Sequence, residues 1–160
     1  QLAQARGEGT PLVAEGVEQV RAAIAELREL ARGIHPSILT HRGLEAAVEA
    51  LTHRMPMPIA LQIPNDRYPP SVESAAYFVV AEALTNVAKY ANAKTAGVVA
   101  TSTDDSLILT IEDDGVGGAR PSVGSGLSGL HDRVTALSGI LTLDSPPGRG
   151  TRIRAEIPLP

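Results

Sequence analysis

The hydrophobic pattern divides the chain into two parts, and the first part is helical. Between residues 13 and 34, apolar side chains recur at alternating intervals of four and three residues, which is typical of a coiled-coil or helix-bundle seam. An ordinary amphipathic surface helix is the alternative. A second short helix is expected at 43–51, beyond Pro36. We therefore expect residues 1–54 to form part of a dimerisation hairpin and its connector. The seam positions are Val13, Val17, Val20, Ile24, Leu27, Ala31 and Ile34.

From residue 55 to residue 160 the pattern changes to short alternating runs separated by turns. Ser71 is expected to cap the first helix of this part and Gly139 to end the second. Helices segregated from mainly hairpin-linked strands predict an α+β fold, a two-layer α/β sandwich in which helices cover one face of a mixed sheet. Strands are predicted at 59–63, 96–102, 107–113, 140–145 and 151–157, and helices at 71–92 and 127–138.

Composition limits the core and the classes of partner. Apolar residues make up 43% of the chain, but with one Phe, three Tyr and no Trp the core must be aliphatic. The formal charge of −4 comes with no basic block, so nucleic acid is not an expected partner. The lack of Cys excludes disulfides and suits a cytoplasmic protein, or the cytoplasmic part of a membrane-anchored sensor. Because the chain begins at Gln1, we expect it to be a piece of a longer protein.

A polar row follows one face of the predicted helix 71–92. At 100° per residue, Glu82, Asn86 and Lys89 fall within about 60° of one another. The Asn amide offers a neutral oxygen ligand, the Glu carboxylate can order a water, and the Lys ammonium supplies positive charge. The row therefore suits a metal ion with phosphates, and a plain solvent-exposed helix face is the alternative.

An aspartate and two spaced glycines follow the predicted strand 107–113. Asp113, Gly115 and Gly117 form a D-x-G-x-G motif. An ionised aspartate only accepts hydrogen bonds, so it can bind an exocyclic amine such as that of adenine. The glycines let the backbone approach a flat ring and adopt positive φ. A glycine-rich turn that ends a strand is the alternative, and the neighbouring Asp114 is expected to be solvated.

The next glycine cluster fits phosphates better than a dinucleotide. Gly124, Gly126 and Gly129 match G-x-G-x-x-G, but that fingerprint must directly follow a strand, and residues 114–123 intervene here. Backbone N–H groups of Gly124, Gly126 and the following helix can still bind phosphates. We expect residues 114–123 to form a short lid. The motifs of P-loop proteins and of ordinary protein kinases do not occur in this sequence.

The order of these motifs resembles that of the Bergerat-fold ATPases, which include histidine kinases, gyrase, mismatch-repair ATPases and anti-sigma kinases. "EALTNVAKYA", "DDGVGG", "GSGLSGL" and "GRGT" are similar to the N box, the G1 and G2 boxes and the closing Thr of that superfamily. "AIAELRELARGIHPSILTHRGLEAAVEAL" resembles the second dimerisation helix and connector of the nitrate-sensor/DesK class of sensor histidine kinases. The resemblance implies the ATP-binding catalytic part of a protein-histidine kinase.

The resemblance also implies roles for individual residues. Asn86 would ligate Mg²⁺, Glu82 would support the metal through water, and Lys89 would contact phosphate. Tyr90 would line the nucleotide pocket, and Asp113 would bind the adenine amine. The other implied ATP-binding residues are Gly115 and Gly117 in the adenine pocket, Gly124, Gly126 and Leu127 in the lid and phosphate loop, and Thr151 on the adenine side.

The resemblance does not extend to the phosphoacceptor. The family carries it in a His-Asp pair followed by Gln on the first dimerisation helix, and no such pair occurs here, since His35 matches the connector. The full-length homodimer would pass the γ-phosphoryl group of ATP to a His outside this sequence and then to an Asp of a response regulator. This chain alone is expected to be unable to autophosphorylate, because it lacks the phosphoacceptor His. An anti-sigma serine kinase, which generally lacks a heptad helix, and a non-catalytic ATP-sensing or dimerisation module remain alternatives.

Overall fold

The computed structural model describes residues 36–120 and 126–160, which belong to one compact unit. The predicted seam at 13–34, His35 and Gly124 lie outside the described residues. The elements are the helices α2 (Ser37–Thr52), α3 (Pro70–Asn86), η1 (Val87–Ala91) and α4 (Gly126–Thr135), and the strands β1 (Ile59–Gln62), β2 (Ala96–Ser102), β3 (Ser106–Asp113), β4 (Ile140–Asp144) and β5 (Thr151–Pro158).

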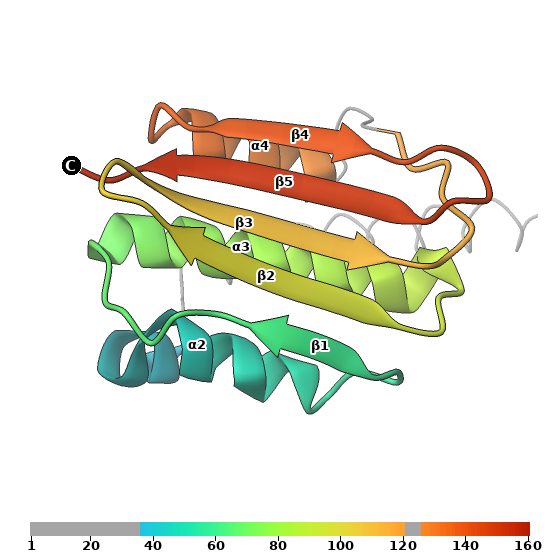
Figure 1. Cartoon of the computed structure of the whole chain (residues 1–160), viewed down its shortest axis with the longest axis horizontal. Helices are drawn as coiled ribbons and strands as arrows, with labels where there is room; N and C mark the ends of the chain where they lie inside the picture. The colour runs from blue at the N-terminus through green and yellow to red at the C-terminus, as the bar shows by residue number, and fades with distance from the viewer. Residues whose placement is uncertain (1–35, 121–125) are drawn as a thin grey trace, which may run out of the picture. The chain divides into compact units, whose positions relative to one another are not determined.

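The five strands form one mixed sheet in the order β1-β2-β3-β5-β4 (Figure 1). Strands β1 and β2 are parallel and are joined through α3, as parallel neighbours require a crossover connection. The remaining pairs are antiparallel, and β2–β3 and β4–β5 are hairpins. The predicted mixed sheet and both predicted hairpins are therefore confirmed.

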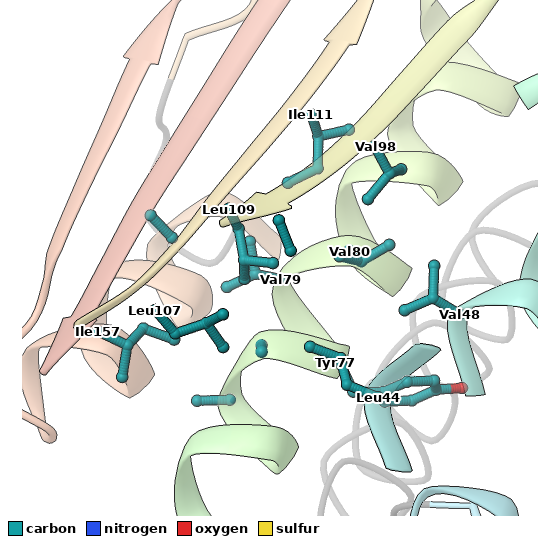
Figure 2. Packing of buried hydrophobic residues seen from close by; sticks show 14 of the residues in the cluster. Leu44, Val48, Tyr77, Val79, Val80, Val98, Leu107, Leu109, Ile111 and Ile157 are labelled. Carbon is teal, nitrogen blue, oxygen red and sulfur yellow. The ribbon is translucent and has the colours of Figure 1, made fainter. Parts of the chain in front are cut away.

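The helices cover one face of the sheet, as the pattern predicts, and the core between the two layers is aliphatic. Alternate residues of β3 are buried (Leu107, Leu109 and Ile111), and Val79 and Val80 of α3 are fully buried in the same cluster. Figure 2 shows these strand and helix side chains pointing toward one another. Among the described helices, none is long and apolar enough to cross a membrane.

Helix α2 packs on α3 and contributes to the same core. Its residues Leu39, Leu44 and Val48 are buried in the cluster that also holds the strand side chains. Residues 36–54, which we expected to group with the preceding helical region, therefore pack into the unit that carries the sheet. Helix α2 is broken at Gly43, whose φ of 81° and ψ of −175° are not helical, so the short helix predicted at 43–51 corresponds to its second part.

An ion pair in which the carboxylate is buried and the guanidinium is half-exposed connects the first part of α2 to the start of α3. Glu73 is only 2% exposed, and its Oε1 accepts hydrogen bonds from Arg67 Nε at 2.8 Å and from the backbone N–H of Tyr68 at 3.1 Å. The Nη2 group of Arg67 donates to the carbonyl of Thr40 in α2 at 3.2 Å. Hydrogen bonding to the Glu73 carboxylate raises the pKa of Arg67 above its ordinary value.

The start of α3 differs from the prediction. The helix begins at Pro70, with Pro69 at the N-cap, and the carbonyl of Pro69 accepts from the backbone N–H of Val72 at 2.9 Å and of Glu73 at 3.0 Å. Ser71 lies inside the first turn and is not the cap. Proline suits the first helical position because the N–H that it lacks would have no partner within the helix.

The end of α4 also differs in detail. The helix ends at Thr135, and the residue with a left-handed φ is Ser138 (59°) rather than Gly139. The backbone N–H of Gly139 donates to the carbonyl of Val134 at 2.9 Å. A Cβ at Gly139 would lie 2.5 Å from the carbonyl oxygen of Glu156 in β5. Glycine is therefore needed here for its small size.

Candidate functional site

Most of the predicted site residues lie at one end of the sheet, at the right of Figure 1, where the end of β3, the start of β5 and the end of the helix α3–η1 meet. Asp113 is the last residue of β3, and it lies opposite Thr151, the first residue of β5. Directly opposed residues of an antiparallel pair project to the same face. Because Ile111 and Ile153, two residues away on each strand, are buried, Asp113 and Thr151 face the side of the sheet that the helices cover.

The glycine loop, residues 113–118, lies between the end of α3–η1 and the hairpin loop, residues 145–150, that joins β4 to β5. Backbone hydrogen bonds hold it on both sides, so its course is set by the chain itself. Four backbone N–H groups donate to carbonyl oxygens here: Val116 to Ala91 (2.8 Å), Gly118 to Ser145 (2.9 Å), Gly148 to Val116 (2.7 Å) and Gly150 to Gly115 (2.9 Å).

Two glycines of the motif are required by this packing. A Cβ at Gly115 would overlap the carbonyl oxygen of Ala91 and lie 2.8 Å from its carbonyl carbon. Gly117 has a φ of 61°, and a Cβ there would overlap the carbonyl oxygen of Pro146. The sequence led us to expect a close approach to a flat ring, whereas these two contacts are with the protein's own backbone.

The two adjacent aspartates have different surroundings. Asp113 is half-buried, and its Oδ1 accepts a hydrogen bond from the backbone N–H of Gly115 at 2.8 Å. Its Oδ2 has no hydrogen-bond partner among the described residues. One carboxylate oxygen of Asp113 therefore shapes the loop, while the other is able to accept a hydrogen bond from a ligand.

Asp114, expected to be merely solvated, holds the turn between η1 and β2. Its Oδ1 accepts from the backbone N–H of Lys94 at 2.7 Å and of Thr95 at 3.0 Å, and its Oδ2 accepts from the Thr95 hydroxyl at 3.2 Å. These hydrogen bonds, first the one from the Thr95 backbone, hold the pKa of Asp114 below its ordinary value. The side chain is exposed, yet it fixes this turn beside the glycine loop.

The polar residues at the end of α3 complete the site. Glu82 and Asn86 are half-exposed, and neither makes a side-chain hydrogen bond within the described part of the chain. The Glu82 carboxylate lies against Gly126, where a Cβ would overlap it. Beyond Asn86 the helix continues as the π-helix η1, which turns by less than 100° per residue. The helical projection used above therefore places Glu82 and Asn86 correctly, but it does not apply to Lys89 and Tyr90. Both are exposed, Tyr90 to 72%.

Sequence reasoning missed Ser145, at the start of the hairpin loop. Its Oγ lies 2.9 Å from the hydroxyl oxygen of Thr151 and accepts a hydrogen bond from the backbone N–H of Ala119 at 3.0 Å. The alternation of β4 could have indicated that Ser145 faces the site, because Leu143 packs against the core and Ser145, two residues later, lies on the same face. Leu127, a predicted site residue, is half-buried against the core at the start of α4.

The sequence of this chain matches a known family of ATPases. Residues 71–160 match the model of the family described as histidine kinase-, DNA gyrase B-, and HSP90-like ATPases. The match covers more than half of the chain, so the chain belongs to this family. The resemblance to Bergerat-fold ATPases is thereby confirmed.

Similar proteins within the family are bacterial sensor kinases. The chain is 30% identical over 161 residues to the sensor histidine kinase NarS of Mycobacterium tuberculosis, covering 94% of this chain and 38% of NarS. It is 29% identical over 146 residues to the oxygen sensor histidine kinase NreB of Staphylococcus carnosus, covering 85% of this chain and 42% of NreB. The chain thus spans less than half the length of these relatives.

Solved structures show the same fold. The histidine kinase domain of the Erythrobacter litoralis EL346 blue-light activated histidine kinase matches with a TM-score of 0.61 and 23% identity, covering 73% of this chain and 59% of that domain. The ATP binding domain of PrrB from Mycobacterium tuberculosis matches with a TM-score of 0.54 and 21% identity, covering 73% of this chain and 91% of that one.

Proposed function

We propose that this chain is the ATP-binding catalytic part of a two-component sensor histidine kinase. The observation that carries the proposal is the position of Asp113. Its Oδ2 lacks a partner among the described residues, Thr151 lies beside it on the same face, and the polar residues Glu82 and Asn86 end the helix that covers that face.

The base-binding part of the site is built for an exocyclic amine. An ionised carboxylate only accepts hydrogen bonds, so the second oxygen of Asp113 pairs with the 6-amino group of adenine and repels the 6-oxo group of guanine. Gly115 and Gly117 allow the loop beside the base to pack against Ala91 and Pro146, and Thr151 would lie on the adenine side. Tyr90, largely exposed, lies on η1 and would cover the nucleotide.

The phosphate part of the site suits a metal that arrives with the nucleotide. Among the described residues, no three carboxylate, His or Cys side chains cluster as a metal cage. Mg²⁺ commonly uses one or two protein oxygens together with phosphates and waters, so the donor set of Asn86 and Glu82 fits it. When bound, Mg²⁺ would neutralise charge on the phosphates. Lys89 and the first backbone N–H groups of α4, at Gly126 and Leu127, would also bind phosphate, as would Gly124, outside the described residues.

The proposed reaction moves the γ-phosphoryl group to a histidine that this sequence does not contain. The bond between the γ-phosphorus and the bridging oxygen breaks, a phosphorus–nitrogen bond forms to the imidazole, and ADP leaves. Positioning and charge neutralisation supply the catalysis. The full-length protein would act as a cytoplasmic homodimer, or as the cytoplasmic part of a membrane-anchored one, and would pass the phosphoryl group to an Asp of its response regulator.

The test is phosphoryl transfer to a separately supplied dimerisation helix that carries the acceptor His, with γ-labelled ATP. We expect acid-labile, base-stable label on that helix and none on this chain. The matched controls are an acceptor His→Gln helix and the variant Asn86→Asp of this chain.

Three outcomes would contradict the proposal. ATP binding without label on the acceptor would leave a non-catalytic ATP-sensing module. Acid-stable label on serine would favour a serine kinase. Label on His35 of this chain would show that the acceptor had been misassigned.

A further inference from the structure

Asp113 lies at the very end of its strand, so its position depends on what holds the chain beyond it. In the pairing of β2 with β3 it lies opposite Ala96, the first residue of β2. In the pairing of β3 with β5 it lies opposite Thr151, the first residue of β5. Ends of elements open more readily than the middle of a sheet. The Asp113 carboxylate is therefore held in place only if the residues after it are attached.

The next residue, Asp114, provides such an attachment with its side chain. Its backbone N–H donates to the carbonyl of Thr95 over a long distance, 3.4 Å. Its carboxylate adds three shorter hydrogen bonds, from the backbone N–H groups of Lys94 and Thr95 to Oδ1 and from the Thr95 hydroxyl to Oδ2. Because an ionised carboxylate only accepts, the direction of each hydrogen bond is determined. Hydrogen bonds to an ionised acceptor are also stronger than neutral ones.

The turn at 94–95, to which Asp114 is attached, is itself fixed to η1. The following residue, Ala96, is buried in a small cluster with Val87 and Ala91 of η1. Its backbone N–H donates to the carbonyl of Pro58 at 3.2 Å. The hydrogen bonds of Asp114 therefore connect the end of β3 to η1, the element that continues the polar end of α3.

This connection bears on Asp113 because hydrogen bonds depend steeply on geometry. The Asp114 side chain is exposed, so its hydrogen bonds to residues 94–95 are its main contribution to this end of the sheet. A hydrogen bond weakens steeply as its angle and distance depart from the optimum. A shift at the end of β3 would thus weaken the pairing of Asp113 with an amine, even with the Asp113 side chain unchanged.

We propose that Asp114 is a positioning residue for the recognition of 6-amino purine nucleotides. It holds the end of β3 against residues 94–95 and so sets where the Asp113 carboxylate meets the base. Asp114 acts through Asp113 and does not itself contact the base. This inference rests on the proposed function, in which Asp113 binds the base.

The test is the ratio of ATP to ITP affinity, measured by calorimetric titration. ITP carries a 6-oxo group and a ring N–H where ATP carries an amine and a ring nitrogen, and the two nucleotides have the same phosphates. The ratio therefore reports on the base and not on Mg²⁺ or the phosphates. We expect Asp114→Ala to lower the ratio about tenfold, the scale of one misplaced hydrogen bond. Asp104→Ala, at the exposed tip of the β2–β3 hairpin, should leave it unchanged.

The conservative variant Asp114→Asn separates position from stability. The carbonyl oxygen of its amide can accept from both backbone N–H groups, and its NH₂ group can donate to the Thr95 hydroxyl oxygen. Asp114→Asn should therefore keep a ratio close to that of wild type, even though the loss of charge lowers the stability of the fold.

A double variant shows whether Asp114 acts through Asp113. In the Asp113→Ala background there is no carboxylate to position, so Asp114→Ala should cause no further change in the ratio. Should Asp114→Ala fail to fold, Asp114→Glu takes its place. It keeps the charge, but its side chain is one methylene longer and should shift the attachment, so the ratio should fall.

Each outcome decides between the positioning role and the proposed function. An unchanged ratio in Asp114→Ala, an equal fall in Asp114→Asn, or a further fall in the Asp113→Ala background would overturn the positioning role and leave the proposed function standing. A wild-type chain that binds ITP as tightly as ATP, or binds neither, would overturn the proposed function itself.

Discussion

At the scale of single residues, the backbone of the glycine loop approaches its neighbours so closely that a methyl group has no place. We predict that Gly115→Ala lowers the free energy of unfolding by about 1–3 kcal/mol, because its Cβ would overlap the carbonyl of Ala91, and overpacked sites typically cost that much. Denaturant unfolding measures the change.

The matched control for that substitution is Gly97→Ala in β2. A Cβ there would meet the carbonyl oxygen of Ala60 at 3.9 Å, an ordinary contact, so we expect a change within about 0.5 kcal/mol. Equal effects of Gly115→Ala and Gly97→Ala would show that the approach to Ala91 does not constrain the loop.

The carboxylate of Asp114 should give the fold a dependence on acid pH. Its pKa is lowered by hydrogen bonds from the backbone N–H groups of Thr95 and Lys94. A carboxyl group with a lowered pKa stabilises the folded state above its unfolded-state pKa, near the ordinary value of 3.8, and this stabilisation is lost as pH falls through the folded-state pKa. Asp114→Asn should therefore be less stable than wild type at pH 7.

The stability difference between wild type and Asp114→Asn should shrink as pH falls below the ordinary carboxyl range. Thermal unfolding at a series of pH values checks this, with Asp104→Asn at the exposed tip of the β2–β3 hairpin as the control. A difference that stays constant from pH 7 to pH 2 would show that the Asp114 hydrogen bonds do not depend on its charge.

At the scale of elements, Glu73 joins α2 to α3. Removing one partner of a fully buried ion pair costs about 3–5 kcal/mol. Because the Arg67 side chain is 53% exposed and can be rehydrated, we predict a smaller loss, about 1–3 kcal/mol, for Glu73→Ala. Denaturant unfolding gives the loss. The substitution should increase the rate of amide hydrogen exchange most in the first part of α2, where Arg67 contacts Thr40.

The control for Glu73 is a surface pair of similar geometry. Glu112 and Arg152 approach to 2.8 Å, but their side chains are 47% and 62% exposed. Glu112→Ala should cost at most about 1 kcal/mol, as exposed ion pairs do. Comparable losses of unfolding free energy in Glu73→Ala and Glu112→Ala would show that the burial of Glu73 does not increase its contribution to stability.

The strands were predictable from sequence because each obeys a local rule. In β3, for example, Leu107, Leu109 and Ile111 are buried against the helices and alternate with half-buried positions. The end of the helix near Asn92 was predicted, but its last turn, the π-helix η1, was not, because the carbonyl of Ala91 there accepts from Val116, a residue far along the chain. Local periodicity contains no signal for such a contact.

The same distinction applies within the site. Motif spacing pointed to Asp113 and the family resemblance to Thr151, and the two residues lie opposite each other in the sheet. Neither signal indicated Ser145 or the hydrogen bonds of Asp114, because both residues act on loops that the fold brings together from distant positions. The expected roles of the site residues in ATP binding stay predictions.

At the scale of the whole described unit, the elements gather the site at one end of the sheet. Helix α3 begins beside the Glu73–Arg67 pair and continues into η1, which ends beside the glycine loop, so the two together join the contact with α2 to the site (Figure 1). The hairpin loop at 145–150 closes the same end. We propose that an adenine nucleotide binds there, with Asp113 accepting a hydrogen bond from its amine.

Calorimetric titration of Asp113→Asn with ATP, ADP and adenosine, with and without Mg²⁺, tests whether Asp113 binds the base. The variant loses the charge that pairs with the amine, and a poorly paired polar group costs about 1–3 kcal/mol, or about tenfold or more in affinity. We predict similar losses for all three ligands, independent of Mg²⁺. Asn86→Asp is the control, and its effect should depend on Mg²⁺ and on the number of phosphates. Unchanged affinity of Asp113→Asn for adenosine and ATP, or wild-type binding of GTP as tight as that of ATP, would contradict recognition of adenine by Asp113.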